Sequence, residues 1–521
     1  MSSRRWFYAA VALSATLHLI GMARTPLPAQ DGLKFLRVAR QFQSEAWGDV
    51  VRSSDQHPLY PALIAAAEPV VSLVVRSKPD AWRIAAQGVS ALAAVALLWP
   101  LRRLTANLFD EPTANLTVLL YALLPFPAAI GHDTLSDSLA LSFTVAALCL
   151  GEATLRTGGW APAVGCGVAA GLGFLTRPEA ALVPPVVALA SVWRRRTWPG
   201  EIAMFGRLAA MALALLVFVG GYALVKGELS EKLSIRWSIR IGTDAHIARK
   251  PPPILPRGLD DPRFDFSPKE ESGQASLSGR PLDATIQLAR EWAQGLGWVL
   301  VLPLIGGFLG ARKLGASVDA RRLILVYLVV FSLIAIRHAA TLGYLSGRHA
   351  LSLIVATIPF ASAGLIGWAS GFPARRGMSL ATGRRLGYAG LAALAVVGIV
   401  AQAKMGHPSR WGHHSAGVWL AEKADPNDAV LDTRGWASFV RGIPGYDYWH
   451  VRQALSDRQL KYVVVGSDEL KAPSRRAATL RALLARAGTP VASFAGRRDG
   501  RGSGVEVYRF EAPQSWEGIT P

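Results

Sequence analysis

The stretch WFYAAVALSATLHLIGMARTPLPAQDGLKFLRVARQF, residues 6–42, contains an apolar run, Trp6–Ala23, followed closely by two prolines and the carboxylate of Asp31. A helix needs about 20 apolar residues to cross a hydrocarbon core roughly 30 Å thick. Pro26 and Pro28 prevent that helix from continuing. The stretch therefore predicts a first membrane span that ends beside an acidic side chain.

The composition of the whole chain agrees with a membrane location. Of 521 residues, 51% are hydrophobic and only 18% are charged, which is too apolar for a soluble protein of this size. The net charge of +20 does not indicate a nucleic-acid partner, because Lys and Arg gather at the ends of apolar runs rather than along one polar face. Cys149 and Cys166 lie inside apolar runs, so no disulfide framework is expected in external segments. The lipid bilayer is the first expected partner.

The apolar pattern predicts a mainly α, polytopic transmembrane helix bundle with about eleven spans. Arg4 and Arg5 precede the first span, but we expect it to remain uncleaved, since it would belong to the bundle. The expected spans are Trp6–Ala23, Trp82–Leu101, Thr113–Gly131, Ser138–Leu155, Trp160–Thr176, Ala180–Trp193, Leu208–Val225, Trp292–Gly310, Leu323–Ile336, Ala350–Gly371 and Leu386–Ala403.

The orientation of the bundle follows from its basic residues, which accumulate in cytoplasmic loops. With eleven spans, five basic clusters fall on one side: Arg4/Arg5, Arg102/Arg103, Arg194–Arg196, Arg312/Lys313 with Arg321/Arg322, and Arg375/Arg376 with Arg384/Arg385. This requires that His57–Val75, with three prolines and Glu68, lie on the outer surface as a broken helix. The expected location is the cytoplasmic (inner) membrane, with the N-terminus in the cytoplasm.

The chain divides into two expected parts. Residues 1–404 form the bundle, with outer loops at 24–81 and 226–291; the second loop is proline-rich and is either a gate over a substrate or a linker. Residues 405–521 change to short strands, DAVLDT, KYVVVGS and VEVYRFE, alternating with helical stretches. This pattern predicts a small soluble α/β domain outside the cytoplasm, with no glycine-rich phosphate loop.

Acidic residues mark the outer rim at two places. Asp31 is a candidate functional group, although it also suits the cap of a helix that begins at Gly32. Asp133 and Asp137 flank the outer start of the fourth span, and a spacing of four places both on one face if the helix begins early. The alternative is that one of them is only a helix cap, because a helix N-terminus favours carboxylates.

Two basic residues face the same rim. Arg177 and Glu179 lie in an outer turn, where a local ion pair is the simpler interpretation. Arg348 and His349 open the tenth span, where an arginine either binds a lipid phosphate or snorkels to the interface.

The order of these features resembles a known family. An Asp after the first helix, HPLYP with His57 and Tyr60, a DS pair at Asp137, RPE at Arg177 and GRHALSLIVATIP from Gly347 are similar to the C-superfamily membrane glycosyltransferases. That family includes protein O-mannosyltransferases and the aminoarabinose transferase of lipid A. The resemblance covers residues 1–405. HPLYP lacks one proline of the usual pattern, and the late arginine is followed by His349 rather than tyrosine, so no specific member is indicated.

The resemblance implies an enzyme of the cell envelope that moves a sugar from a polyprenyl-phosphate donor to an acceptor outside the cytoplasm, with inversion. Asp31 would be the general base, a role that partial burial promotes by raising a carboxylate pKa. Asp137 would stabilise the oxocarbenium-like transition state or hold a divalent ion, Mg or Mn, together with Asp31. Arg348, with Arg177 in reserve, would stabilise the leaving phosphate. Asp133, Glu179, His57, Tyr60 and His349 would support these groups.

Two other classes of function fit a polytopic bundle with charged residues. The main alternative is a transporter or flippase for a lipid-linked or small anionic substrate, since such proteins also place charges on their substrate path. The expected charges, however, gather at one face rather than at the midplane, and no inverted repeat is evident. A non-catalytic scaffold is the third candidate. The sugar and the acceptor stay open at this point.

Overall fold

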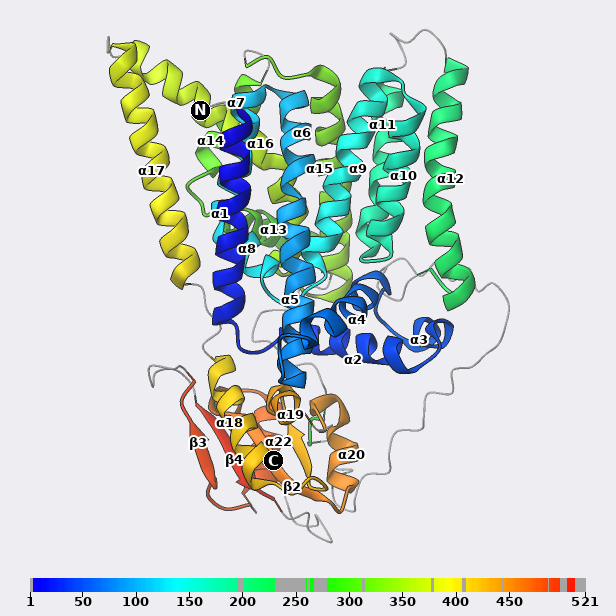
Figure 1. Cartoon of the computed structure of the whole chain (residues 1–521), viewed down its shortest axis with the longest axis vertical. Coiled ribbons are helices and arrows are strands. Elements are labelled where there is room, and N and C mark those ends of the chain that lie inside the picture. Colours follow the sequence, from blue (N-terminus) through cyan, green and yellow to red (C-terminus); the bar gives the residue numbers. More distant parts are fainter. Residues whose placement is uncertain are drawn as a thin grey trace.

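A long helical bundle with a small domain at one end makes up the molecule (Figure 1). The computed structural model describes residues 3–194, 201–229, 259, 263–266, 279–311, 314–375, 379–404, 409–442, 445–485, 487–496 and 504–510. We call the end of the bundle that carries the C-terminal domain the domain end, and the other the opposite end.

Within the described residues, six helical segments are long and apolar enough to cross a membrane. They are α1 (Ser3–Arg24), α5 with α6 (Lys78–Ala96 and Leu98–Leu108), α9 (Asp137–Thr157), α12 (Glu201–Lys226), α15 (Val318–Leu342) and α16 (Gly347–Arg375). The bent pair α7 (Glu111–Leu123) and α8 (Pro125–Gly131), with 68° between its halves, makes a possible seventh. The shorter apolar helices of the bundle are α10 (Trp160–Phe174), the 3-10 turn η1 (Pro178–Leu182) with α11 (Val183–Arg194), α14 (Val301–Gly310) and α17 (Leu380–Lys404). The predicted polytopic helical bundle is confirmed.

One expected span, Trp292–Gly310, was wrong as a single helix. Helix α13 (Pro281–Gly295) ends inside it, and α14 has only ten residues. Between them Gly297 and Trp298 both have left-handed backbones, with φ of 71° and 62°. Glycine adopts this conformation readily and it interrupts a helix, whereas the apolar composition does not reveal the break.

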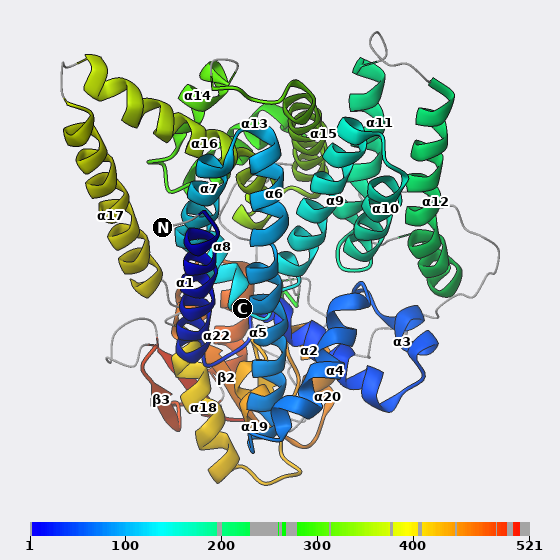
Figure 2. The ribbon, with the colours of Figure 1, turned by 45° about the horizontal axis from the view of Figure 1, so that its top comes forward.

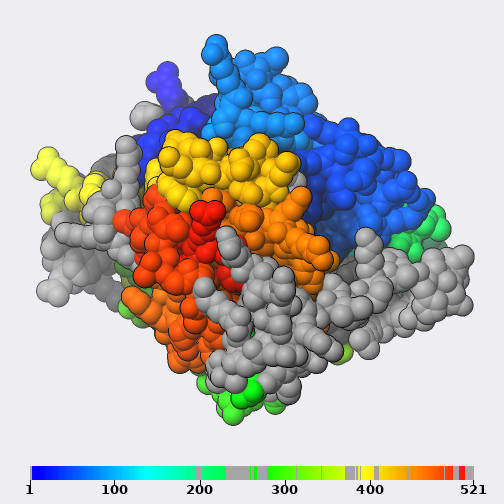
Figure 3. All heavy atoms as spheres, turned by 90° about the horizontal axis from the view of Figure 1, so that it is seen from below, coloured from blue at the N-terminus to red at the C-terminus, as the bar shows by residue number. Residues whose placement is uncertain are grey.

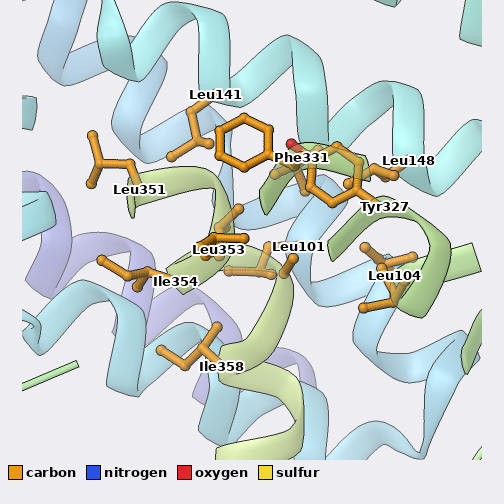
Figure 4. Close-up of a cluster of buried hydrophobic side chains, with 14 of the residues drawn as sticks. Leu101, Leu104, Leu141, Leu148, Tyr327, Phe331, Leu351, Leu353, Ile354 and Ile358 are labelled. Atoms are coloured by element: carbon orange, nitrogen blue, oxygen red, sulfur yellow. The ribbon is translucent and has the colours of Figure 1, made fainter. Parts of the chain in front are cut away.

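Four helices pack around a shared core in the middle of the bundle (Figure 4). Figure 4 labels Leu101 and Leu104 of α6, Leu141 and Leu148 of α9, Tyr327 and Phe331 of α15, and Leu351, Leu353, Ile354 and Ile358 of α16. In a bilayer, lipid tails are as apolar as these side chains, so close packing contacts rather than exclusion of water hold the helices together.

Three short helices lie at the domain end of the bundle, beside the C-terminal domain (Figures 1 and 2). They are α2 (Gln30–Ser44), α3 (Trp47–Ser53) and α4 (Leu59–Ser72). Helix α4 occupies most of His57–Val75, the segment expected to be a broken surface helix; it is one helix through Pro69 and has only 14 residues. Its buried Glu68 is held by Gln43 of α2 at 3.1 Å and by Ser72 at 2.6 Å.

The C-terminal domain is a four-stranded sheet with helices (Figure 3 views it from below). Its strands, in the order β1-β2-β4-β3, are β1 (Ala429–Asp432), β2 (Leu460–Gly466), β3 (Ala492–Phe494) and β4 (Val505–Arg509). Strands β1 and β2 are parallel, and the other pairs are antiparallel. The helices are α18 (Ser409–Lys423), α19 (Trp436–Arg441), η3 (Tyr448–His450), α20 (Val451–Ser456), α21 (Ser467–Lys471) and α22 (Arg475–Leu484). The predicted α/β fold is confirmed; β3 was missed because it has three residues.

Part of the long loop between α12 and α13 belongs to the core of this domain. Leu259, Phe264 and Phe266 are buried there. The backbone of Asp265 accepts a hydrogen bond from Tyr448 Oη at 2.8 Å, and its N–H donates to Thr479 Oγ1 at 2.8 Å. This segment connects the loop to the domain. Most of loop 226–291, with the predicted gate or linker, lies outside the described residues.

The described members of the basic clusters share the opposite end of the bundle. Arg4 and Arg5 start α1, Arg102 and Arg103 are in the last two turns of α6, and Arg321 and Arg322 are in the first turns of α15. These helix ends lie at the top of Figure 1, away from the C-terminal domain.

Candidate functional site

A chain of alternating acidic and basic side chains crosses the domain end of the bundle. Asp31 Oδ2 accepts a hydrogen bond from Arg348 Nη1 at 2.6 Å. Arg348 Nε and Nη2 donate to Asp137 Oδ2 at 3.1 and 2.7 Å. Asp137 Oδ1 forms an ion pair with Arg177, whose Nε lies 3.8 Å from Glu179 Oε2. Five of the predicted site residues, from four separate parts of the sequence, therefore meet in one cluster.

Asp31 reaches this cluster from the first turn of α2. Ala29, the residue before the helix, makes no side-chain cap, and the Asp31 carboxylate is directed to Arg348, so the alternative role of Asp31 as a helix cap was wrong. Gly32 allows α2 to lie close to the loop that carries Thr134, because a Cβ at position 32 would be 1.9 Å from Thr134 Oγ1. The side chain of Asp31 is 53% exposed, so it is accessible from outside the protein.

Asp137 has a different environment. Its side chain is only 3% exposed, and each carboxylate oxygen is bonded to a guanidinium group. A buried carboxylate is costly unless it is paired in this way. It opens α9, but the preceding Ser136 makes no side-chain cap. The arrangement lets Asp137 hold Arg177 and Arg348 side by side, each with about a quarter of its side chain exposed.

His57 and Tyr60 lie behind the cluster rather than in it. Tyr60 is fully buried, and its hydroxyl lies 2.8 Å from Ser90 Oγ, which donates to Leu135 O at 2.8 Å, two residues before Asp137. The ring of His57 stacks on Tyr222 and meets Phe174 edge-on, with 5.1 Å between centroids in both pairs. Both residues thus pack against the segments that present the charged groups.

The HPLYP segment and the RPE turn are also joined directly. The backbone N–H of Leu59 donates to Leu175 O at 2.9 Å. This bond connects the start of α4 to the turn that carries Arg177, two residues after Leu175.

Asp133 faces away from the cluster, contrary to the expected shared face with Asp137. Helix α9 begins only at Asp137, so Asp133 lies in the preceding loop. Its Oδ2 accepts from Arg410 Nη2 of α18 at 2.7 Å, and its Oδ1 accepts from the backbone of Ala29 at 3.0 Å. Arg410 also donates to Leu27 O at 3.0 Å. Asp133 thereby connects the C-terminal domain to the segment that leads into Asp31.

Trp436 of α19 strengthens this attachment. Its Nε1 donates to Pro28 O at 2.9 Å, and Arg410 lies over its ring at 5.7 Å from the centroid. The sequence reasoning missed Arg410 and Trp436. No motif marks them, because they act only through contact with a loop some 400 residues away in the sequence.

His349 contacts the end of α15 and the loop that follows it, and no hydrogen bond joins it to Asp137 among the described residues. Its Nδ1 lies 3.0 Å from Ser346 Oγ, and its ring packs near His338 and Tyr344, at 5.2 and 6.0 Å between centroids. It borders the cluster on the side of Glu179 without joining the chain of ion pairs.

The residues present do not fit a preformed divalent-metal site. In the described part of the chain, no three or more His, Cys, Asp and Glu side chains come together as ligands of one metal ion. Asp31 and Asp137, the expected ligands, share Arg348 instead. Binding of Mg or Mn thus stays an alternative to the arginine-paired cluster, and chelation distinguishes the two.

The comparisons with known proteins agree with this architecture. A crystal structure of ArnT from Cupriavidus metallidurans bound to undecaprenyl phosphate matches with a TM-score of 0.59 at 15% identity, covering 99% of each chain. This chain therefore shares its overall fold with that ArnT structure. The oligosaccharyltransferase of Archaeoglobus fulgidus, in its apo form, matches with a TM-score of 0.56 at 12% identity, over 99% of this chain and 75% of that one. The predicted resemblance is confirmed.

The sequence matches cover only part of the chain. Residues 58–221 match the family model for dolichyl-phosphate-mannose-protein mannosyltransferase. A curated relative, the undecaprenyl phosphate-alpha-4-amino-4-deoxy-L-arabinose arabinosyl transferase of Yersinia pestis, is 28% identical over 143 residues, 27% of this chain. This chain therefore aligns with only 25% of the length of that curated relative.

Proposed function

We propose that this protein transfers a sugar from a polyprenyl-phosphate donor to an acceptor hydroxyl or amine at the domain end of the bundle, with inversion. The observation that carries the proposal is the pairing of half-exposed Asp31 with Arg348, held by buried Asp137. A base and a phosphate-binding cation thus lie within one hydrogen bond of each other at the rim where a lipid-linked sugar would arrive.

Arg348 connects donor binding to the freeing of the base. In the structure its Nη1 is bonded to Asp31, while Nε and Nη2 are bonded to Asp137. A phosphate oxygen is an acceptor of the same kind as a carboxylate oxygen. The donor phosphate therefore replaces Asp31 at Nη1, and Asp31 becomes available to the acceptor. Asp137 keeps the guanidinium oriented throughout, so we assign it as a positioning residue.

Asp31 then acts as the general base. The acceptor oxygen or nitrogen forms a bond to the anomeric carbon as the bond from that carbon to the phosphate oxygen breaks. The proton of the acceptor goes to Asp31, and the electron pair goes to the phosphate. Attack from the side opposite the phosphate inverts the anomeric centre.

Arg348 and Arg177 favour the transition state over the bound donor. The phosphate charge grows from about −1 toward −2 as the bond breaks, and fixed cations stabilise the larger charge more strongly. Because Asp137 holds both guanidinium groups in place, little reorganisation is required during the reaction.

The donor class is supported by what the similar structures contain. The ArnT structure is bound to undecaprenyl phosphate, and a structure of the Archaeoglobus fulgidus oligosaccharyltransferase, with a TM-score of 0.55 and 12% identity, contains dolichol-phosphate. These bound lipid phosphates do not distinguish a hexose from a pentose as the transferred sugar. With the basic clusters in the cytoplasm, the N-terminus is cytoplasmic, and the C-terminal domain lies outside the inner membrane.

A panel of radiolabelled polyprenyl-phosphate sugars tests the proposal. The purified full-length protein is incubated with each donor and a membrane extract as the source of acceptor. We expect label from at least one donor to leave the polyprenyl-phosphate fraction with the wild type and to stay there with Asp31→Asn. A transporter or a scaffold would leave every donor intact, which would refute the proposal.

A further inference from the structure

A hollow at the opposite end of the bundle, remote from the ion-pair cluster, has the chemistry of a lipid site. It lies between α1, α6 and α9 and has a volume of about 460 Å³. Ligand pockets in proteins typically measure about 300–1,000 Å³. Phe7, Ala146 and Leu150 are among the apolar residues that line it.

The rim of the hollow carries positive charge that no described acidic side chain neutralises. Arg4 and Arg103 both line it and are exposed, and neither forms a hydrogen bond or an ion pair with any residue in the described ranges. Arg102, also in the lining, is already committed: it pairs with Glu111 and lies over the ring of Phe7 at 5.1 Å from the centroid. The rim therefore has two available guanidinium groups.

Aromatic side chains complete the arrangement. Tyr8 and Trp99 line the same hollow and are 59% and 48% exposed. Tyr and Trp are enriched at the level of lipid headgroups, where one end of the ring is apolar and the other wet. The apolar wall thus suits an acyl chain, and the arginines suit a lipid phosphate. The aromatic residues suit the headgroup level between the two.

We propose that this hollow binds one anionic glycerophospholipid of the leaflet at the opposite end, with its phosphate held by Arg4 and Arg103 and an acyl chain against α9. Charge complementarity selects this occupant over a zwitterionic lipid, because basic pockets between membrane helices on the cytoplasmic side favour anionic headgroups. The bound lipid would hold α1 against α6 and α9 near the membrane surface.

Native mass spectrometry of the full-length protein, purified and titrated with phosphatidylglycerol or phosphatidylcholine, tests this site. We expect one phosphatidylglycerol to be retained preferentially. Each of Arg4→Gln and Arg103→Gln should weaken its retention about fivefold, the effect typical of one basic residue at an anionic surface. Arg5→Gln is the matched control, since Arg5 is exposed on the same helix but does not line the hollow.

Because these arginines are exposed, their replacement should leave the melting temperature in the absence of added lipid unchanged. Equal retention of the two lipids by the wild type, or an equal effect of all three substitutions, would overturn the proposal. Sugar transfer is not part of this readout, so the outcome is independent of the proposed function.

Discussion

Replacement of Arg348 by glutamine should reduce sugar transfer far more than donor binding. The guanidinium makes three charge-assisted hydrogen bonds, two to Asp137 and one to Asp31, which fix it beside the expected phosphate. During transfer the phosphate gains about one negative charge. At about 4 Å and an effective dielectric constant near 20, a fixed positive charge stabilises that change by about 4 kcal/mol. The expected loss in kcat is therefore about 10³-fold.

Lysine at the same position makes the test more specific. Arg348→Lys keeps the charge but cannot bridge Asp31 and Asp137 with a planar fork, so we expect an intermediate rate. The assay measures release of label from a radiolabelled polyprenyl-phosphate sugar under single-turnover conditions, with Arg37→Gln on α2 as an exposed control. If Arg348→Gln reacts within about threefold of the wild type, Arg348 does not stabilise the leaving phosphate, and the assignment fails.

Three further changes probe the supports of the site. Gly32→Ala should displace Asp31 and lower kcat strongly, because the added methyl group would collide with Thr134. Gly48→Ala is the control and should leave kcat unchanged, since only the end of Arg52 lies nearby. Equal activities of the two variants would refute the argument that Gly32 is needed for the contact with Thr134. Arg410→Ala should destabilise docking of the C-terminal domain by roughly 3–5 kcal/mol, because it removes the guanidinium that pairs with buried Asp133. Limited proteolysis should release the domain faster than in the exposed control Arg458→Ala, and an unchanged rate would contradict this. Chelation with EDTA should leave transfer intact, because both oxygens of Asp137 are bonded to arginines; a loss that added Mg²⁺ restores would show a metal requirement.

The helices of the bundle were predictable because the apolar runs are long and bounded by basic residues. Ser138–Leu155 and Ala350–Gly371, for example, lie within α9 and α16. The prediction failed at Trp292–Gly310, where the break depends on the backbone conformation of Gly297 and Trp298. Apolar composition carries no information about such a local dihedral change, since glycine is common in membrane helices.

The candidate site was only partly predictable. The rim position of Asp31, Asp137, Arg177 and Arg348 followed from where the apolar runs end, and their convergence followed from the resemblance. The ion-pair partner of each of these side chains did not follow from the sequence. Asp133 and Asp137 are four residues apart, yet the first binds Arg410 and the second binds Arg177 and Arg348. The start of α9 at Asp137 separates them, and helix boundaries are the least certain part of any sequence interpretation.

The most direct test of the central claim is the single-turnover transfer rate of Asp31→Asn. Asparagine keeps the size of the side chain and can still accept a hydrogen bond from Arg348, but it cannot take a proton from the acceptor. Asp49→Asn on α3, an exposed acid paired only with Arg52 among the described residues, is the control. The account predicts that Asp31→Asn binds the polyprenyl-phosphate sugar and transfers it at least about 10²-fold more slowly, the usual contribution of a general base. Transfer by Asp31→Asn at the rate of the Asp49→Asn control would contradict it.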